Sequence, residues 1–135
     1  MHLIVCVDEQ YGMSFARRRQ SMDRVLRERM LALVGDAPLW VSSYTAGQFK
    51  PWPENLKVDP EYLQQAGQGE YCFAEVADLR GCSEKIENII LYKWNRRYPA
   101  DRRFPAELLE GRSCTQTAEF PGNSHENITQ EVYTL

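Results

Sequence analysis

Residues 3–8 read Leu-Ile-Val-Cys-Val-Asp, a continuous apolar run that ends at a carboxylate. A run of this length, rich in β-branched side chains, is typical of a strand that is buried on both faces. Residues 9–20 follow, with Gly12 as their one flexible point, and we interpret them as an irregular loop. The chain is therefore predicted to open with an interior strand and a loop at the carboxyl end of that strand.

Residues 21–34 carry apolar side chains at helical spacing, namely Met22, Val25, Leu26, Met30 and Leu33. Ser21 is suited to the N-cap of this helix, and Gly35 stands where a C-terminal glycine is favoured. Asp23 then falls in the first turn of the helix, one loop after the buried strand. Because α/β sheets place ligands at the carboxyl ends of their strands, we predict that Asp23 lies near a ligand site.

Length and composition limit the class of protein. The chain has 135 residues, which suits a single domain spanning residues 1–135. A net charge of −3 argues against a general nucleic-acid binder. No apolar run approaches the roughly 20 residues of a membrane span, and no signal-peptide pattern is seen, so we expect a cytoplasmic protein. The four cysteines form no C-x-x-C pair and are expected to be free thiols, and two isolated histidines predict no metal site.

The remaining chain alternates between strand and helix patterns. Further strands are predicted at residues 38–43, 70–76, 86–94, 113–120 and 128–135, and short helices at 44–49 and 59–66, the latter with Asp59 as N-cap. The stretch 70–79 also fits a helix. The last two strands flank a turn and predict a hairpin. This order favours an α/β fold with a mostly parallel central sheet and an antiparallel C-terminal edge, in which strand 3–8 lies beside strands 38–43 and 86–94.

Four stretches, in the same order, make the chain resemble dihydrofolate reductase. Residues 3–8 and 11–14 are similar to the opening strand and loop of that family, and residues 39–45 are similar to its second strand and threonine. Asp23 stands at the position of the pterin-binding carboxylate. Residues 100–105, Ala-Asp-Arg-Arg-Phe-Pro, follow the family's Gly-Asp-x-x-Phe-Pro signature closely. The resemblance implies a dihydrofolate-reductase-like three-layer fold with helices on both faces of the sheet.

The resemblance also implies a set of site residues. Asp23 is the expected catalytic carboxylate, although a first-turn acid that is favoured by the helix dipole is the alternative interpretation. Ligand-binding residues are expected at Ile4, Val5, Cys6, Met13, Thr45 and Tyr92. The consecutive Arg17, Arg18 and Arg19 could hold an anion, or could simply be a solvated loop.

Departures from the family pattern affect the cofactor site. Residues 73–80 contain no glycine and carry Glu75 and Asp78, where the family has a glycine pair that lets its backbone approach the cofactor pyrophosphate. Ser42-Ser43 replaces an arginine suited to the 2′-phosphate of NADPH. We therefore expect no cofactor and no reductase activity, but a small planar ligand, pterin-like or nucleotide-like, or a protein partner. The alternatives are an NADPH-dependent dihydrofolate or related pterin reductase with an unusual cofactor site, and an oligomeric scaffold such as a homo-oligomer.

Overall fold

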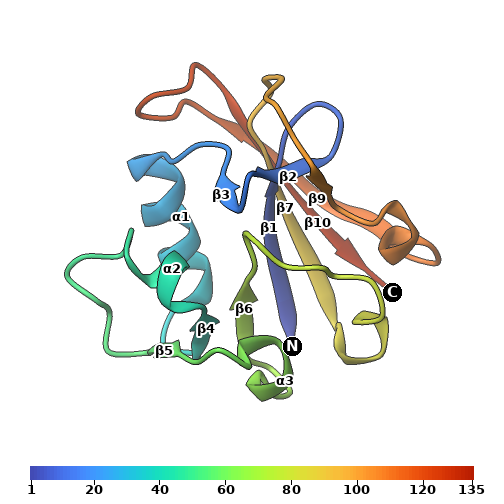
Figure 1. Ribbon diagram of the computed structural model, residues 1–135. Helices are drawn as coiled ribbons and strands as arrows, with labels where there is room; N and C mark the ends of the chain where they lie inside the picture. Colours follow the sequence, from blue (N-terminus) through green and yellow to red (C-terminus); the bar gives the residue numbers. More distant parts are fainter.

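The computed structural model describes residues 1–135, the whole chain. Its main sheet contains strands β1 (His2–Val7), β4 (Leu39–Val41), β5 (Leu56–Val58), β6 (Tyr71–Phe73), β7 (Asn88–Lys93), β9 (Ser113–Phe120) and β10 (Ile128–Thr134). They lie in the order β5-β4-β6-β1-β7-β10-β9 (Figure 1). The pairs among β5, β4, β6, β1 and β7 are parallel, and β10 runs antiparallel to both β7 and β9. The predicted fold class, with its antiparallel C-terminal edge, is confirmed.

Strand β1 is the interior strand that its sequence predicts, because Leu3, Ile4 and Val5 are fully buried. It pairs with β7, as expected, but its other neighbour is β6 and not β4. The prediction that β1 lies beside residues 38–43 is therefore wrong. Strand β6 lies between them and pairs with β1 on one side and with β4 on the other. The start of the stretch 70–79 is therefore a strand and not a helix.

A second, three-stranded sheet contains β2 (Gly12–Phe15), β3 (Arg18–Arg19) and β8 (Arg102–Arg103) in the order β3-β2-β8. The predicted irregular loop 9–20 is therefore wrong, since most of it forms the β2–β3 hairpin. Ala16 and Arg17, both at positive φ, make the tight turn between these strands. The Ala16 N–H donates to Asp101 Oδ2 at 3.0 Å, which ties the turn to the loop before β8.

The helices are α1 (Arg24–Val34), α2 (Ser43–Ala46), α3 (Tyr62–Gln65) and the 3-10 turns η1 (Ser83–Lys85) and η2 (Ala106–Leu109). Gly35 ends α1 as predicted, but the N-cap is Asp23 and not Ser21. Asp59 does not cap α3, which begins after Glu61. Its carboxylate instead accepts from the Glu61 N–H at 2.7 Å in the turn before the helix.

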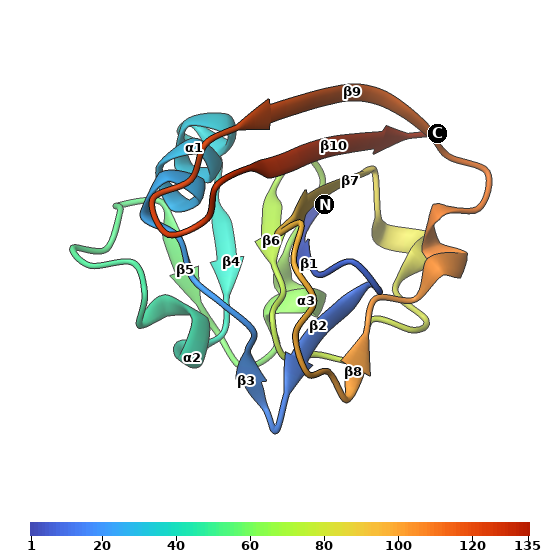
Figure 2. The ribbon, with the colours of Figure 1, turned by 90° about the horizontal axis from the view of Figure 1, so that it is seen from above.

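Two apolar clusters on opposite faces of the sheet make three layers. Leu26 and Met30 of α1 pack with Ile4 and Ile90 on one face, where α2 also lies. The other face is covered by α3 and the 3-10 turns. Figures 1 and 2 place the β9–β10 turn beside the start of α1. All four cysteines are free, as predicted. None of the helices is both long and apolar enough to cross a membrane.

Candidate functional site

A small cavity lies at the carboxyl ends of three neighbouring parallel strands. Cys6, Ala74 and Trp94 line it from the ends of β1, β6 and β7, and Met13 of β2 and residues 19–21 close it. Carboxyl ends of parallel strands are where α/β proteins commonly bind ligands. The cavity measures only about 10 Å³, so the protein's own side chains fill the space that a ligand would need.

An ion pair closes this cavity on one side. Arg19 Nε donates to both carboxylate oxygens of Glu75, at 3.1 and 3.0 Å. The Glu75 residue is only 7% exposed, so its charge depends on this guanidinium for compensation. Because Arg19 comes from β3 and Glu75 follows β6, the pair fastens the β2–β3 hairpin to the main sheet at the carboxyl end of β6.

Two residues around α2 complete the surroundings of this pair. The Arg19 guanidinium lies over the Tyr44 ring, 4.2 Å from its centroid, and Arg19 Nη2 donates to the Tyr44 carbonyl at 3.3 Å. Gln48 Nε2 donates to Glu75 Oε1 at 2.9 Å. A planar cation is thus held by a buried carboxylate at its edge and by an aromatic ring on its face.

Asp23 lies immediately before α1, with its carboxylate in the protein interior. Its Oδ1 accepts from the N–H groups of Val25 and Leu26 and so caps α1. The same carboxylate accepts from the N–H groups of Asn123 and Ser124 in the β9–β10 turn. Its side chain is fully buried, and it does not line the cavity. Every one of these partners belongs to the protein itself.

Charge on Asp23 is stabilised by these bonds. Burial raises the pKa of its carboxyl, but the bonds from Asn123, His125 and Ser124 outweigh burial and hold the pKa well below its usual value. Asp23 is therefore ionised at neutral pH, where it supports the imidazole of His125.

His125 is the residue at which three segments meet. Its Nδ1 lies 2.9 Å from Asp23 Oδ2, and its Nε2 lies 2.9 Å from Ser21 Oγ and 3.1 Å from the Tyr98 hydroxyl. The Trp94 ring stacks on the imidazole with centroids 4.5 Å apart. The side chain of His125 is 2% exposed, which makes this an ordered, nearly dry network beside the cavity.

Asp8, at the end of β1, holds the loops that carry this network. Its carboxylate accepts from the N–H groups of Gln10, Gly12 and Tyr98 and from Gln20 Nε2. Burial raises the pKa of Asp8, and the bonds from these backbone groups outweigh it and lower the pKa. One carboxylate thus binds Gln20, which precedes Ser21, and the backbone of Tyr98.

Of the other predicted site residues, Cys6, Met13 and Arg19 come together at the cavity. Burial, followed by the charge of Glu75, raises the pKa of the Cys6 thiol. This thiol is therefore protonated at neutral pH and acts as an apolar wall. Arg17 and Arg18 are exposed and lie outside the cavity.

The remaining predicted residues belong to the packed interior. Ile4 and Val5 are buried in the core on opposite faces of β1. Thr45 is buried in α2, where its Oγ1 accepts from Ser42 Oγ at 3.2 Å. Tyr92 is fully buried with no hydrogen-bond partner for its hydroxyl, and burial raises its pKa.

Our sequence interpretation did not select His125, Tyr98, Trp94 or Ser21 as members of a site. The sequence gives only weak indications of their roles. His125 is one of two histidines and follows a turn, and Trp94 ends an apolar strand. Glu75 was considered only as a charge that repels phosphate. Its pairing with Arg19, 56 positions away, has no local signature.

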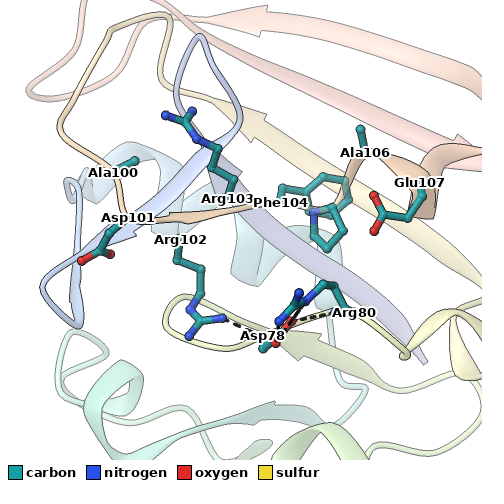
Figure 3. A pocket seen from close by; sticks show the side chains of 10 residues that line it. Asp78, Arg80, Ala100, Asp101, Arg102, Arg103, Phe104, Ala106 and Glu107 are labelled. Carbon is teal, nitrogen blue, oxygen red and sulfur yellow. Dashed lines mark hydrogen bonds and ion pairs between the residues drawn. The ribbon is translucent and has the colours of Figure 1, made fainter.

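A wider hollow of about 490 Å³ lies elsewhere, around β8 and η2. In Figure 3, Arg80 and Arg102 point toward Asp78, and Phe104 is buried. Arg80 Nη2 lies 2.6 Å from Asp78 Oδ2, and Arg102 Nη1 lies 4.0 Å from the same oxygen. Exposed arginines and carboxylates here compensate one another, so the hollow has no excess charge that would select a ligand.

Comparisons with known proteins identify the fold. No family model matches the sequence. No curated protein matches it either. Among solved structures, the chain is similar to dihydrofolate reductase from Enterococcus faecalis, complexed with NADP(H) and RAB-propyl, with a TM-score of 0.69 and 10% sequence identity. The match covers 98% of this chain and 94% of that chain. The chain therefore has a dihydrofolate-reductase-like fold, reached with a strongly divergent sequence.

Proposed function

We propose that this protein binds a small planar ligand beside Glu75 and does not act as an NADPH-dependent reductase. The observation that carries this proposal is the Arg19 guanidinium seated on the Glu75 carboxylate and over the Tyr44 ring. A guanidinium presents a planar edge of N–H donors to a carboxylate. Arg19 therefore resembles the chemical group that the site would accept from outside.

The ligand class follows from this geometry. A planar heterocycle with two adjacent N–H donors on one edge, such as a pterin or guanine, can donate one bond to each oxygen of Glu75 after Arg19, whose Nε now donates to both oxygens, moves away. The Tyr44 ring, 40% exposed, offers its face for stacking. Cys6 and Met13 add apolar walls beside the same cavity. Together these groups favour a pterin-like or nucleobase-like ligand.

The segment that carries Glu75 argues against the nicotinamide cofactor. Backbone N–H groups must come close to a pyrophosphate to bind it, and Ala74, Glu75 and Val76 all carry side chains in the segment where the family has glycines. Glu75 also holds the guanidinium of Arg19, so this cation is already paired with a carboxylate of the protein. We therefore expect NADPH to bind weakly.

A reductase is the second candidate, since the similar enterococcal structure is complexed with NADP(H). A calorimetric titration with NADPH and an absorbance assay with dihydrofolate decide between the two candidates. We expect neither tight binding nor turnover at an enzymatic rate. Micromolar binding of NADPH together with measurable turnover would make the reductase the better interpretation.

The ligand proposal is tested by removing the internal competitor. In Arg19→Ala, we expect pterin to bind at least about 10-fold more tightly than to the unchanged protein, which is about 1.4 kcal/mol. Arg18→Ala is the matched control, because Arg18 is exposed and makes no side-chain hydrogen bond or ion pair. Lumazine, which has an oxo group where pterin has the 2-amino group, is the matched control ligand and should bind more weakly.

Glu75→Gln in the Arg19→Ala background should abolish the gain, because a neutral amide cannot accept both N–H bonds. Thermal unfolding with and without pterin checks that each variant is folded. Equal binding of pterin and lumazine, or equal behaviour of Arg19→Ala and Arg18→Ala, would contradict the proposal.

A further inference from the structure

Asp23, His125 and Ser21 form one continuous hydrogen-bonded series. Asp23 Oδ2 lies 2.9 Å from His125 Nδ1, and His125 Nε2 lies 2.9 Å from Ser21 Oγ. The carboxylate and the imidazole are almost completely buried, whereas Ser21 is half-buried and lines the cavity. A carboxylate, an imidazole and a hydroxyl in this order are the parts of an activated serine nucleophile.

The hydrogen-bond partners of His125 determine which nitrogen of its ring carries the proton. Asp23 only accepts, so it places the proton of a neutral His125 on Nδ1. Nε2 then carries the free lone pair and accepts the Ser21 hydroxyl. Asp23 is itself fixed by the Asn123 and Ser124 N–H groups, so the ring is held in one orientation. The imidazole is thus arranged to take a proton from Ser21 Oγ.

Two hydroxyls lie near His125 Nε2, because the Tyr98 hydroxyl is 3.1 Å from the nitrogen that Ser21 Oγ also approaches. One lone pair cannot accept both well. If Ser21 delivers its proton to Nε2, the Tyr98 hydroxyl becomes free to donate to the carbonyl oxygen of the substrate, which becomes an oxyanion when Ser21 Oγ adds to the carbonyl carbon.

The space beside Ser21 limits the substrate. The cavity measures about 10 Å³ and is walled by Cys6, Met13 and Trp94. That volume holds about one water molecule or a group of similar size. The methyl group of an acetyl ester has this size, so a longer acyl chain would not fit, whereas the ester carbonyl and the alcohol part stay outside the cavity, beside Ser21 Oγ.

We propose that Ser21 is the nucleophile of a hydrolase for esters of short acyl groups, with His125 as general base and Asp23 as its positioning residue. Ser21 Oγ bonds to the ester carbonyl carbon while its proton passes to His125 Nε2. The ester C–O bond then breaks, and the Nε2 proton goes to the departing alcohol. Water attacks the acyl-serine and gives a proton to Nε2, and this proton returns to Ser21 Oγ as the carboxylic acid leaves. This activity does not depend on the planar ligand proposed above.

The test uses the full chain with a fluorophosphonate probe and with p-nitrophenyl acetate. We expect one covalent adduct per chain, mapped to Ser21 by peptide mass spectrometry. Ser21→Ala should lose the adduct and at least about 100-fold of the acetate-ester hydrolysis rate. Ser83→Ala is the control, because Ser83 is an exposed serine on η1, far along the chain, and should leave labelling and hydrolysis unchanged.

A chain-length series provides a second readout that needs no variant. The p-nitrophenyl butyrate rate should be at least about 10-fold lower than the acetate rate, because the cavity beside Ser21 is small. Labelling at another residue, no labelling at Ser21, or equal hydrolysis by Ser21→Ala and Ser83→Ala would overturn the proposal. Since none of these measurements involves pterin or Glu75, failure here leaves the planar-ligand proposal to its own titration.

Discussion

Replacing Asp23 by Ala should destabilise the protein far more than a surface helix cap does. The side chain is fully buried and serves two distant parts of the chain, the first turn of α1 and the β9–β10 turn. Loss of an N-cap costs about 1 kcal/mol. Each turn N–H that loses its acceptor inside the protein costs about 1–3 kcal/mol.

The hydrogen bond between His125 Nδ1 and the Asp23 carboxylate adds to this loss. A hydrogen bond to a charged group contributes about 1.5–3 kcal/mol. Because these contributions overlap, we expect the free energy of unfolding to fall by roughly 4 kcal/mol in Asp23→Ala. Asp23→Asn should lose less, since its carbonyl oxygen can still accept from Val25 and Leu26.

Urea unfolding followed by tryptophan fluorescence measures this loss. Asp36→Ala is the matched control, because Asp36 is exposed just beyond α1 and makes no side-chain hydrogen bond. It should change stability by no more than about 0.5 kcal/mol. If Asp23→Ala loses less than about 1 kcal/mol, Asp23 contributes only a helix-dipole interaction and the reasoning is wrong.

Three further outcomes follow from the same contacts. Folding lowers the pKa of Asp23 below its ordinary value of 3.8, so the stabilisation from its charge is complete above that pH and is lost as the pH falls further. The free energy of unfolding should therefore decrease less with falling pH in Asp23→Ala than in the unchanged protein. In Gly122→Ala the new Cβ would lie 2.5 Å from Asp23 Oδ2 and 2.9 Å from Ile128 Cδ1, so the free energy of unfolding in urea should fall by about 1–3 kcal/mol. Gly47→Ala is the control and should change it less, because the nearest atom there is 3.3 Å away. Tyr92→Phe removes a buried hydroxyl that has no partner, so its melting temperature should be unchanged or higher, and a clear decrease would show that the hydroxyl is bonded.

Apolar runs predicted the long strands, and these placed most of the fold. Strand β1 was recognisable because its side chains are apolar on both faces, and the hairpin of β9 and β10 because a turn separates two strand patterns. Strands β3 and β8, with two residues each, escaped prediction because two residues show no periodicity. Strand β5 was missed for a similar reason, since it has three residues and two of them are exposed.

The candidate site was predictable only in its location. The end of β1 was expected to face a ligand site, and Cys6 and Met13 do meet at a cavity there. The roles of the charged residues were not predictable, because they depend on partners far along the chain. Asp23 and His125, for example, form their hydrogen bond although they are 102 residues apart in the sequence.

The fold and the Arg19–Glu75 pair place different demands on the sequence. Burial of apolar side chains specifies the sheet, and many sequences satisfy that requirement, as 10% identity with the enterococcal enzyme illustrates. The ion pair, by contrast, is favourable only when both residues are present. A Glu75 without Arg19 would be a nearly buried charge with no cation, at a cost of about 3–5 kcal/mol. An Arg19 without Glu75 would lose the carboxylate that holds the β2–β3 hairpin against the main sheet. Each charge therefore requires the other, and a ligand that displaces Arg19 must itself present N–H donors to Glu75.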